Sequence, residues 1–206
     1  ITFVDGIKKV VNQYGASAVG VALSERFTME EAYLAVKFAN EVLHTDKIFT
    51  FGINEKRIVD KIENDKTQEI FKRLFGDTFI HGANAYGFKE LLGIKTIKVT
   101  DGLKALIIFG DETPANLPTF DFLAVCGTIL TNAAMDADVF IPASAFTETD
   151  GTFCNSADSV QTVNKAVEPK NGIENWQLIQ KLAFAIDENA FSFDSLQAIQ
   201  NQLFSR

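Results

Sequence analysis

The chain has 206 residues and a formal net charge of −8, and this acidity argues against DNA or RNA as a partner because phosphate binding needs a basic face. Hydrophobic residues make up 47% and charged residues 22%, a balance typical of a globular protein. The sequence has no stretch of about 20 consecutive apolar residues, so direct insertion into a membrane is not expected.

In the first half of the chain, apolar runs alternate with amphipathic stretches. Thr28 and Glu31 form a capping box, which predicts the start of a helix. This helix and the strands on either side of it make one β-α-β unit. The elements expected here are a helix around 6–11, a buried strand at 17–23, a helix from 28 to about 43, a strand at 48–51 and charged, solvated amphipathic helices within 55–75.

The second half continues the alternation, and its strand candidates are apolar throughout, as interior parallel strands should be. Its expected elements are a short helix at 85–92, strands at 103–109, 122–125 and 137–141, and helices at 175–187 and 195–204. The sequence therefore predicts an α/β fold, with a mostly parallel sheet and helices on both faces. We expect one Rossmann-like domain over residues 1–188, with the C-terminal helix of residues 189–206 packed on it.

The cysteines and histidines do not form the ligand set of a metal site. Cys126 lies in an apolar run and is expected to be a buried thiol, whereas Cys154 is expected in a polar loop. An iron-sulfur cluster needs about four closely spaced thiolates. His44 and His81 have no nearby Cys or His, so zinc is not expected either. Two isolated cysteines suit a reducing cytoplasm better than a disulfide scaffold.

Several short segments, taken in chain order, resemble motifs of the molybdopterin oxidoreductase family. The strongest similarity runs over residues 104–183, and a second stretch lies near the start of the chain. The segments are ADVFIPA at 137–143, FTETDGTFCN at 146–155, VQ at 160–161, AVEP at 166–169, NW at 175–176, GANAYG at 82–87, and the set Tyr14, Gly15, Gly20, Ser24, Arg26, Thr28, Glu30, Glu31 and Tyr33.

Within this family, the similarity implies the branch that keeps the fold without the metal, the molybdopterin-like C-terminal region of a peripheral-arm subunit of NADH-quinone oxidoreductase (respiratory complex I). The chain would then be a truncated, non-catalytic scaffold that supports electron transfer from NADH or another donor to quinone. We expect no cofactor in this segment, and iron-sulfur clusters in an N-terminal part outside it. Other subunits of a respiratory complex would be its partners, on the cytoplasmic side of the cell membrane. The start inside a predicted helix, without Met, suggests a fragment of a longer chain.

Two departures from catalytic relatives favour a chain without cofactor. Catalytic members usually ligate the metal through Cys, selenocysteine, Ser or Asp after the first β-α unit. Residues 45–55 offer no Cys or Ser at a strand end, and Asp46 precedes the strand. Asp158 and Ser159 stand where the family has a Gly-Arg pair, and loss of the arginine removes a phosphate-binding fork.

The polar loop after the strand at 137–141 holds the candidate ligand-binding residues, because ligands bind at the carboxyl ends of parallel strands. Thr147, Glu148, Thr152 and Asn155 would line such a crevice, or would only tie the loop to the scaffold. A further acidic pair, Asp111–Glu112, follows the strand at 103–109, where family members contact cofactor. That pair could equally be a solvated turn.

Two alternative functions stay open. The chain could be a fragment of a molybdenum or tungsten oxidoreductase, such as a formate dehydrogenase alpha subunit, whose metal ligand lies elsewhere. It could also be a stand-alone module that binds a nucleotide or a small acid, although it has no G-x-G-x-x-G, Walker A or G-x-S-x-G motif.

Overall fold

A central parallel sheet organises the computed structural model, which describes residues 2–51, 54–56, 66–67, 69–70, 79–81, 84, 87–96, 102–114, 116–154 and 159–205. The six strands of this sheet lie in the order β5-β2-β1-β6-β7-β8, and all neighbouring pairs are parallel. They are β1 (Val19–Leu23), β2 (Ile48–Thr50), β5 (Lys95–Thr96), β6 (Ala105–Phe109), β7 (Phe122–Gly127) and β8 (Val139–Pro142). This order matches that of doubly wound dinucleotide-binding folds, and the predicted α/β class is confirmed.

The burial of each strand matches its apolar composition and its place in the sheet. Every residue of β1, β6 and β7 is buried, because these strands lie inside the sheet with both faces covered. The edge strand β8 is partly exposed and ends at Pro142, which lacks an N–H to donate. The three strands predicted in the second half are thereby confirmed, with boundaries within a few residues.

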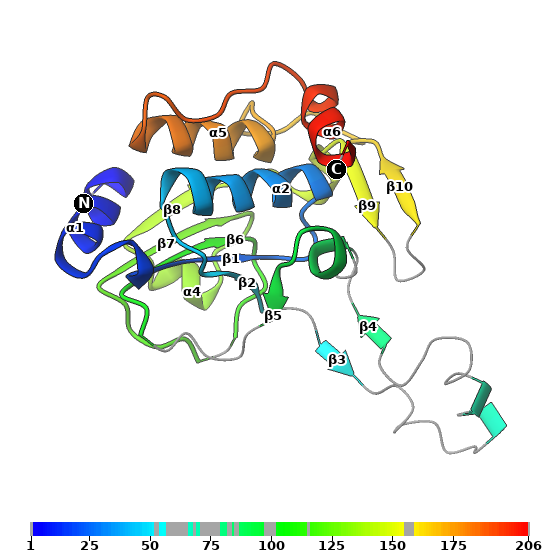
Figure 1. Cartoon of the computed structure of the whole chain (residues 1–206), viewed down its shortest axis with the longest axis horizontal. Helices are drawn as coiled ribbons and strands as arrows, with labels where there is room; N and C mark the ends of the chain where they lie inside the picture. The colour runs from blue at the N-terminus through cyan, green and yellow to red at the C-terminus, as the bar shows by residue number, and fades with distance from the viewer. Residues whose placement is uncertain are drawn as a thin grey trace.

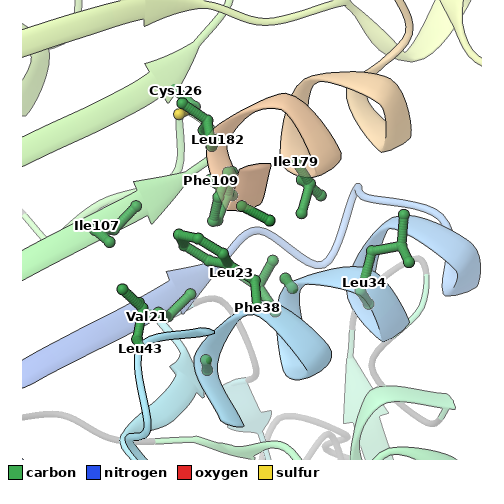
Figure 2. Packing of buried hydrophobic residues seen from close by; sticks show 14 of the residues in the cluster. Val21, Leu23, Leu34, Phe38, Leu43, Ile107, Phe109, Cys126, Ile179 and Leu182 are labelled. Carbon is green, nitrogen blue, oxygen red and sulfur yellow. The ribbon is translucent and has the colours of Figure 1, made fainter. Parts of the chain in front are cut away.

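One face of the sheet carries the larger part of the core, on the side where α1, α2 and α5 lie in Figure 1. It is covered by α1 (Phe3–Tyr14), by α2 (Met29–Lys37) with the π-helical turn η2 (Phe38–Val42), and by α5 (Asn175–Ile186). Figure 2 shows side chains from both layers meeting there. Val21, Leu23, Ile107, Phe109 and Cys126 come from the sheet, Leu34, Phe38 and Leu43 from α2 and the segment after it, and Ile179 and Leu182 from α5.

The opposite face has a smaller core. The short helix α4 (Asn132–Met135) packs Ala133 and Ala134 there, against Leu106, Leu123 and Val125 of the sheet. Neighbouring residues of one strand thus enter different cores, because successive side chains point to opposite faces. Helices on both faces were predicted, and the two cores confirm them.

The last helix, α6 (Leu196–Phe204), packs on α2 rather than on the sheet. Ile199 and Leu203 are buried, and the Tyr33 hydroxyl donates a 3.0 Å hydrogen bond to Gln202. The helix lies where the C-terminal helix was expected, while the domain boundary at residue 188 stays a prediction.

Two antiparallel strand pairs and three short turns also lie among the described residues. The strand pairs are β9 (Gly151–Cys154) with β10 (Val160–Val163), and β3 (Asn54–Lys56) with β4 (Phe79–His81). The turns are η1 (Ala16–Ala18), η4 (Gly87–Leu91) and η5 (Phe146–Glu148).

Two predictions need correction. Cys154 is fully buried at the end of β9, so its expected place in a polar loop is wrong; its backbone N–H donates to the buried Asn84 side chain at 2.7 Å. Residues 55–56, expected in a helix, belong to β3 instead. Most of the predicted amphipathic segment up to residue 75 lies outside the described residues.

Candidate ligand crevice at the topological switch point

A cavity of about 370 Å³ opens at the carboxyl ends of the central strands. After β1 the chain passes through α2 to β2 on one side, and after β6 it continues to β7 on the other. The two connections therefore diverge and leave a crevice between them, which is where open α/β sheets bind ligands. The walls come from residues that follow β1, β6, β7 and β8, and from the first turns of α2 and α5.

Ser24, directly after β1, and Glu112, after β6, meet across the switch point. The Ser24 hydroxyl donates a short hydrogen bond to one Glu112 carboxylate oxygen, and Arg26 Nε lies 2.6 Å from the other. Gly110 permits this approach. Its φ is +125°, and an added Cβ would lie 2.2 Å from the Ser24 Cβ.

Asp111 organises the loop after β7. Its Oδ1 accepts hydrogen bonds from the backbone N–H groups of Thr128 at 2.8 Å and Ile129 at 3.3 Å. Its Oδ2 accepts from the Thr128 hydroxyl. These N–H groups could otherwise bind an anion, so the Asp111 carboxylate occupies the place that a phosphate would need. Gly127 leaves room for it, because a Cβ there would lie 2.6 Å from Asp111 Oδ1.

Another part of the crevice wall lies where the loop after β8 meets the start of α5. The Asn175 side chain accepts from the Ser144 N–H at 2.8 Å and donates to the Ser144 carbonyl at 3.0 Å. Both residues are buried, so this reciprocal pair satisfies backbone groups that water cannot reach. The Ser144 hydroxyl also bonds to the Ile173 carbonyl at 2.7 Å.

Glu31, in the first turn of α2, contributes a buried carboxyl group to the crevice. Its Oε2 accepts from the Thr28 N–H at 2.7 Å, which completes the predicted capping box. Burial raises the pKa of Glu31 to about 8, and the Glu30 charge adds to this, while the Thr28 N–H and the neighbouring Asn175 amide partly offset it. Glu31 is therefore mostly a neutral carboxylic acid at pH 7.

Three of the four loop residues proposed from the sequence, Thr147, Glu148 and Thr152, do not line this cavity. Glu148 binds the Ala145 N–H at 3.0 Å within its own turn, and Thr152 donates two bonds to Glu30 through its N–H and hydroxyl, each 2.9 Å long. Thr147 lies in η5, its carbonyl accepting from the Ala166 N–H at 2.8 Å, while Asn155 lies outside the described residues. The neighbouring Thr149 lines the cavity in their place.

The acidic pair Asp111–Glu112 does lie in the crevice, partly buried and hydrogen-bonded on both residues. Sequence reasoning missed Ser24 and Asn175 as crevice residues and saw Glu31 only as a helix cap. One signal was available for Ser24: it directly follows the first predicted strand, which borders the switch point in a doubly wound sheet.

Sheet order and crevice together define a doubly wound α/β protein with a ligand site at its switch point. The profile of the molybdopterin oxidoreductase family matches residues 57–185, more than half of the chain. The chain therefore belongs to the molybdopterin oxidoreductase family, as its motifs indicated.

Curated relatives carry formate dehydrogenase names. The chain is 38% identical over 89 residues to the F420-dependent formate dehydrogenase subunit alpha of Methanocaldococcus jannaschii. The aligned stretch covers 42% of this chain and 13% of that protein. It is 34% identical over 134 residues to a putative formate dehydrogenase of Staphylococcus haemolyticus, covering 60% of this chain and 13% of that protein. The chain thus spans about an eighth of these relatives' length. Their names favour the formate dehydrogenase alternative over the assignment to NADH-quinone oxidoreductase.

Within the described residues, no group of three or more His, Cys, Asp or Glu side chains is placed to hold a metal ion. Among the same residues, no helix is long and apolar enough to cross a membrane.

Proposed function

We propose that this chain is the segment of a formate-dehydrogenase-type alpha subunit whose crevice holds the nucleoside end of the pterin cofactor. The single observation that carries the proposal is the cavity at the switch point, in a chain of the molybdopterin oxidoreductase family. When bound, the molybdenum or tungsten pterin supplies the redox chemistry, and this segment supplies binding and orientation.

The polar groups of the crevice suit a nucleoside better than a phosphate. Ser24, Asp111 and Glu112 present oxygen atoms whose second lone pairs can accept from ribose hydroxyls or from N–H groups of a base. Arg26, the cation in the cavity wall, is already paired with Glu112. A volume of about 370 Å³ lies at the lower end of small-molecule sites, which fits part of a dinucleotide cofactor rather than the whole.

A cofactor-free scaffold in NADH-quinone oxidoreductase is the second candidate. The observation that favours it is Asp158–Ser159 at the position of the family's Gly-Arg pair. In that case iron-sulfur clusters outside this segment would carry the electrons, and the segment would pack against other subunits on the cytoplasmic side of the membrane.

Calorimetric titration of the chain with guanosine, adenosine and ribose 5-phosphate tests the crevice. We expect a nucleoside to bind more tightly than ribose 5-phosphate, and Glu112→Ala to abolish the binding. Asp46→Ala is the matched control, since this carboxylate is exposed and remote from the cavity wall. Absence of any nucleoside binding at millimolar concentration would contradict the proposal and favour the scaffold.

A second measurement addresses the parent subunit. An alpha subunit that carries this segment should contain molybdenum or tungsten in stoichiometric amount and oxidise formate with an artificial electron acceptor. A metal-free protein that co-purifies with other NADH-quinone oxidoreductase subunits would favour the scaffold instead.

A further inference from the structure

The side chain of Asn171, in the segment between β10 and α5, ties together two parts of the chain beside the crevice. Its Nδ2 donates a 2.9 Å hydrogen bond to the carbonyl of Pro142, the last residue of β8. Its Oδ1 lies 3.2 Å from the Ser144 hydroxyl and 3.3 Å from the Ile173 backbone nitrogen, both of which can donate to it. Ser144 lines the crevice. These three contacts, called the Asn171 clasp below, therefore hold the loop after β8 against the segment that leads into α5.

The residue after Asn171 is a glycine with open space around it. Both residues are exposed, and they form the single Asn-Gly pair of the sequence. Gly172 has a φ of +77°, and a Cβ added to it would meet no atom within 4 Å. A backbone nitrogen that carries no bulky side chain beside it is well exposed to react with the neighbouring asparagine side chain.

We propose that Asn171 is a deamidation site and that the Asn171 clasp controls the reaction. The Gly172 backbone nitrogen gives up its proton and forms a bond to Cγ of Asn171. The bond between Cγ and Nδ2 breaks, and the amide nitrogen takes up a proton and leaves as ammonia. Water then opens the five-membered succinimide ring, which leaves aspartate or isoaspartate at position 171. Water is the only co-reactant, and nothing is oxidised or reduced.

The clasp opposes this reaction in the folded protein. Ring closure turns Cγ of Asn171 towards the Gly172 nitrogen and out of a staggered rotamer, so the bonds to Pro142 and Ser144 must break first. The Gly172 N–H also donates to the Pro169 carbonyl at 3.0 Å and must be released. The reaction therefore proceeds from a locally opened state, and its rate reports how often the clasp opens.

The product cannot rebuild the clasp. A carboxylate accepts hydrogen bonds but has no N–H to donate, so an oxygen of position 171 would face the Pro142 carbonyl oxygen where Nδ2 now binds. Isoaspartate also adds a carbon to the backbone and displaces the turn. Deamidation would thus loosen the crevice wall at residues 143–145 permanently, whatever ligand the crevice binds.

The site can be tested on the folded chain by incubation at mildly alkaline pH. Digestion with an acid protease, which avoids deamidation during the digest, and tandem mass spectrometry then locate each converted asparagine. We expect Asn171 to convert faster than every other asparagine. Asn175 is an internal control, because it is buried and is followed by the bulky Trp176. In the urea-unfolded chain Asn171 should convert about tenfold faster or more, since no clasp restrains it there.

A variant of the clasp tests the control directly. Ser144→Ala removes one contact to Asn171 Oδ1 and should speed conversion of Asn171 in the folded protein about threefold or more. Ser205→Ala, at an exposed serine after α6, is the matched control and should leave the rate unchanged. Circular dichroism checks that both variants fold, and the comparison of folded with unfolded wild type needs no variant.

The substitution Asn171→Asp reproduces one product. Hydrogen exchange should then be faster at the backbone N–H groups of residues 143–145, whereas Asn164→Asp, at an exposed asparagine of the same segment, should leave them unchanged. Conversion of Asn171 no faster than that of the other asparagines would overturn the deamidation site. Equal rates in the folded and unfolded chains, or an unchanged rate in folded Ser144→Ala, would overturn control by the clasp. Unchanged exchange in Asn171→Asp would overturn the effect on the crevice wall.

Discussion

Two adjacent glutamates at the start of α2 show how position decides the behaviour of one residue type. Glu30 is fully buried, and its two oxygens accept from the Thr152 N–H, the Thr152 hydroxyl and the Gln200 amide. Glu31 is equally buried, yet only one of its oxygens has a partner. Burial is the main cause that raises the pKa of Glu31 to about 8, and its hydrogen bonds to Thr28 and Asn175 offset this only in part.

Glu31 should make the protein less stable as the pH rises through neutrality. Its pKa is about 8 in the folded state against an ordinary value of 4.5, so between these values the folded state binds a proton that the unfolded state releases. The contribution of Glu31 to the free energy of unfolding is complete below pH 4.5. It decreases between pH 4.5 and pH 8, by at most about 1.4 kcal/mol per pH unit. Urea denaturation at pH 5, 6, 7 and 8 measures this. Glu31→Gln should lack the decrease, and parallel curves for the two proteins would contradict the assignment.

At the scale of elements, α1 is held to the sheet by a close approach of its backbone. Gly6 is buried in the helix, and an added Cβ would lie 2.2 Å from the Phe122 ring of β7. The Phe3 ring packs edge-on against the same ring, with centroids 6.4 Å apart. Glycine normally weakens a helix interior, so its presence here reflects packing rather than helix propensity.

Gly6→Ala should therefore destabilise the protein, although alanine is the better helix former. Propensity favours the change by about 1 kcal/mol, while overpacking against an aromatic ring costs about 1–3 kcal/mol. We expect a lower thermal midpoint by calorimetry. Asn12→Ala, at an exposed position of the same helix, should raise the midpoint slightly, and a rise for both variants would contradict the packing argument.

For the whole molecule, Glu30 connects parts that are far apart in sequence. It joins α2 to the β9–β10 hairpin through Thr152 and to α6 through Gln200, over 122 and 170 residues of chain. Tyr33 of α2 also donates a hydrogen bond to Gln202 of α6, at 3.0 Å. The buried Glu30 side chain thus links α2, β9 and α6.

Glu30→Ala should lower the free energy of unfolding by about 3 kcal/mol, because it leaves buried donors of Thr152 without partners. Hydrogen exchange should show β9, α6 and the start of α2 losing protection together. Glu41→Ala, which removes an exposed i,i+4 ion pair with Lys37, should cost only about 0.5 kcal/mol and leave that protection unchanged. A purely local loss at α2 would contradict the linking role.

The amino-acid sequence by itself determined five strands of the central sheet and the main helices that cover it, the fold class and the family. Uninterrupted apolar runs at β1, β6 and β7, the Thr28–Glu31 capping box and the motif around residues 137–155 are local patterns, and local patterns report burial and helix ends directly. Tertiary structure alone decided which side chains meet. Ser24 and Glu112 lie 88 residues apart and come together only because β1 and β6 are neighbours in the sheet. The burial of Cys154 and the protonation of Glu31 likewise depend on neighbouring elements, since desolvation is set by what packs around a group rather than by its sequence context.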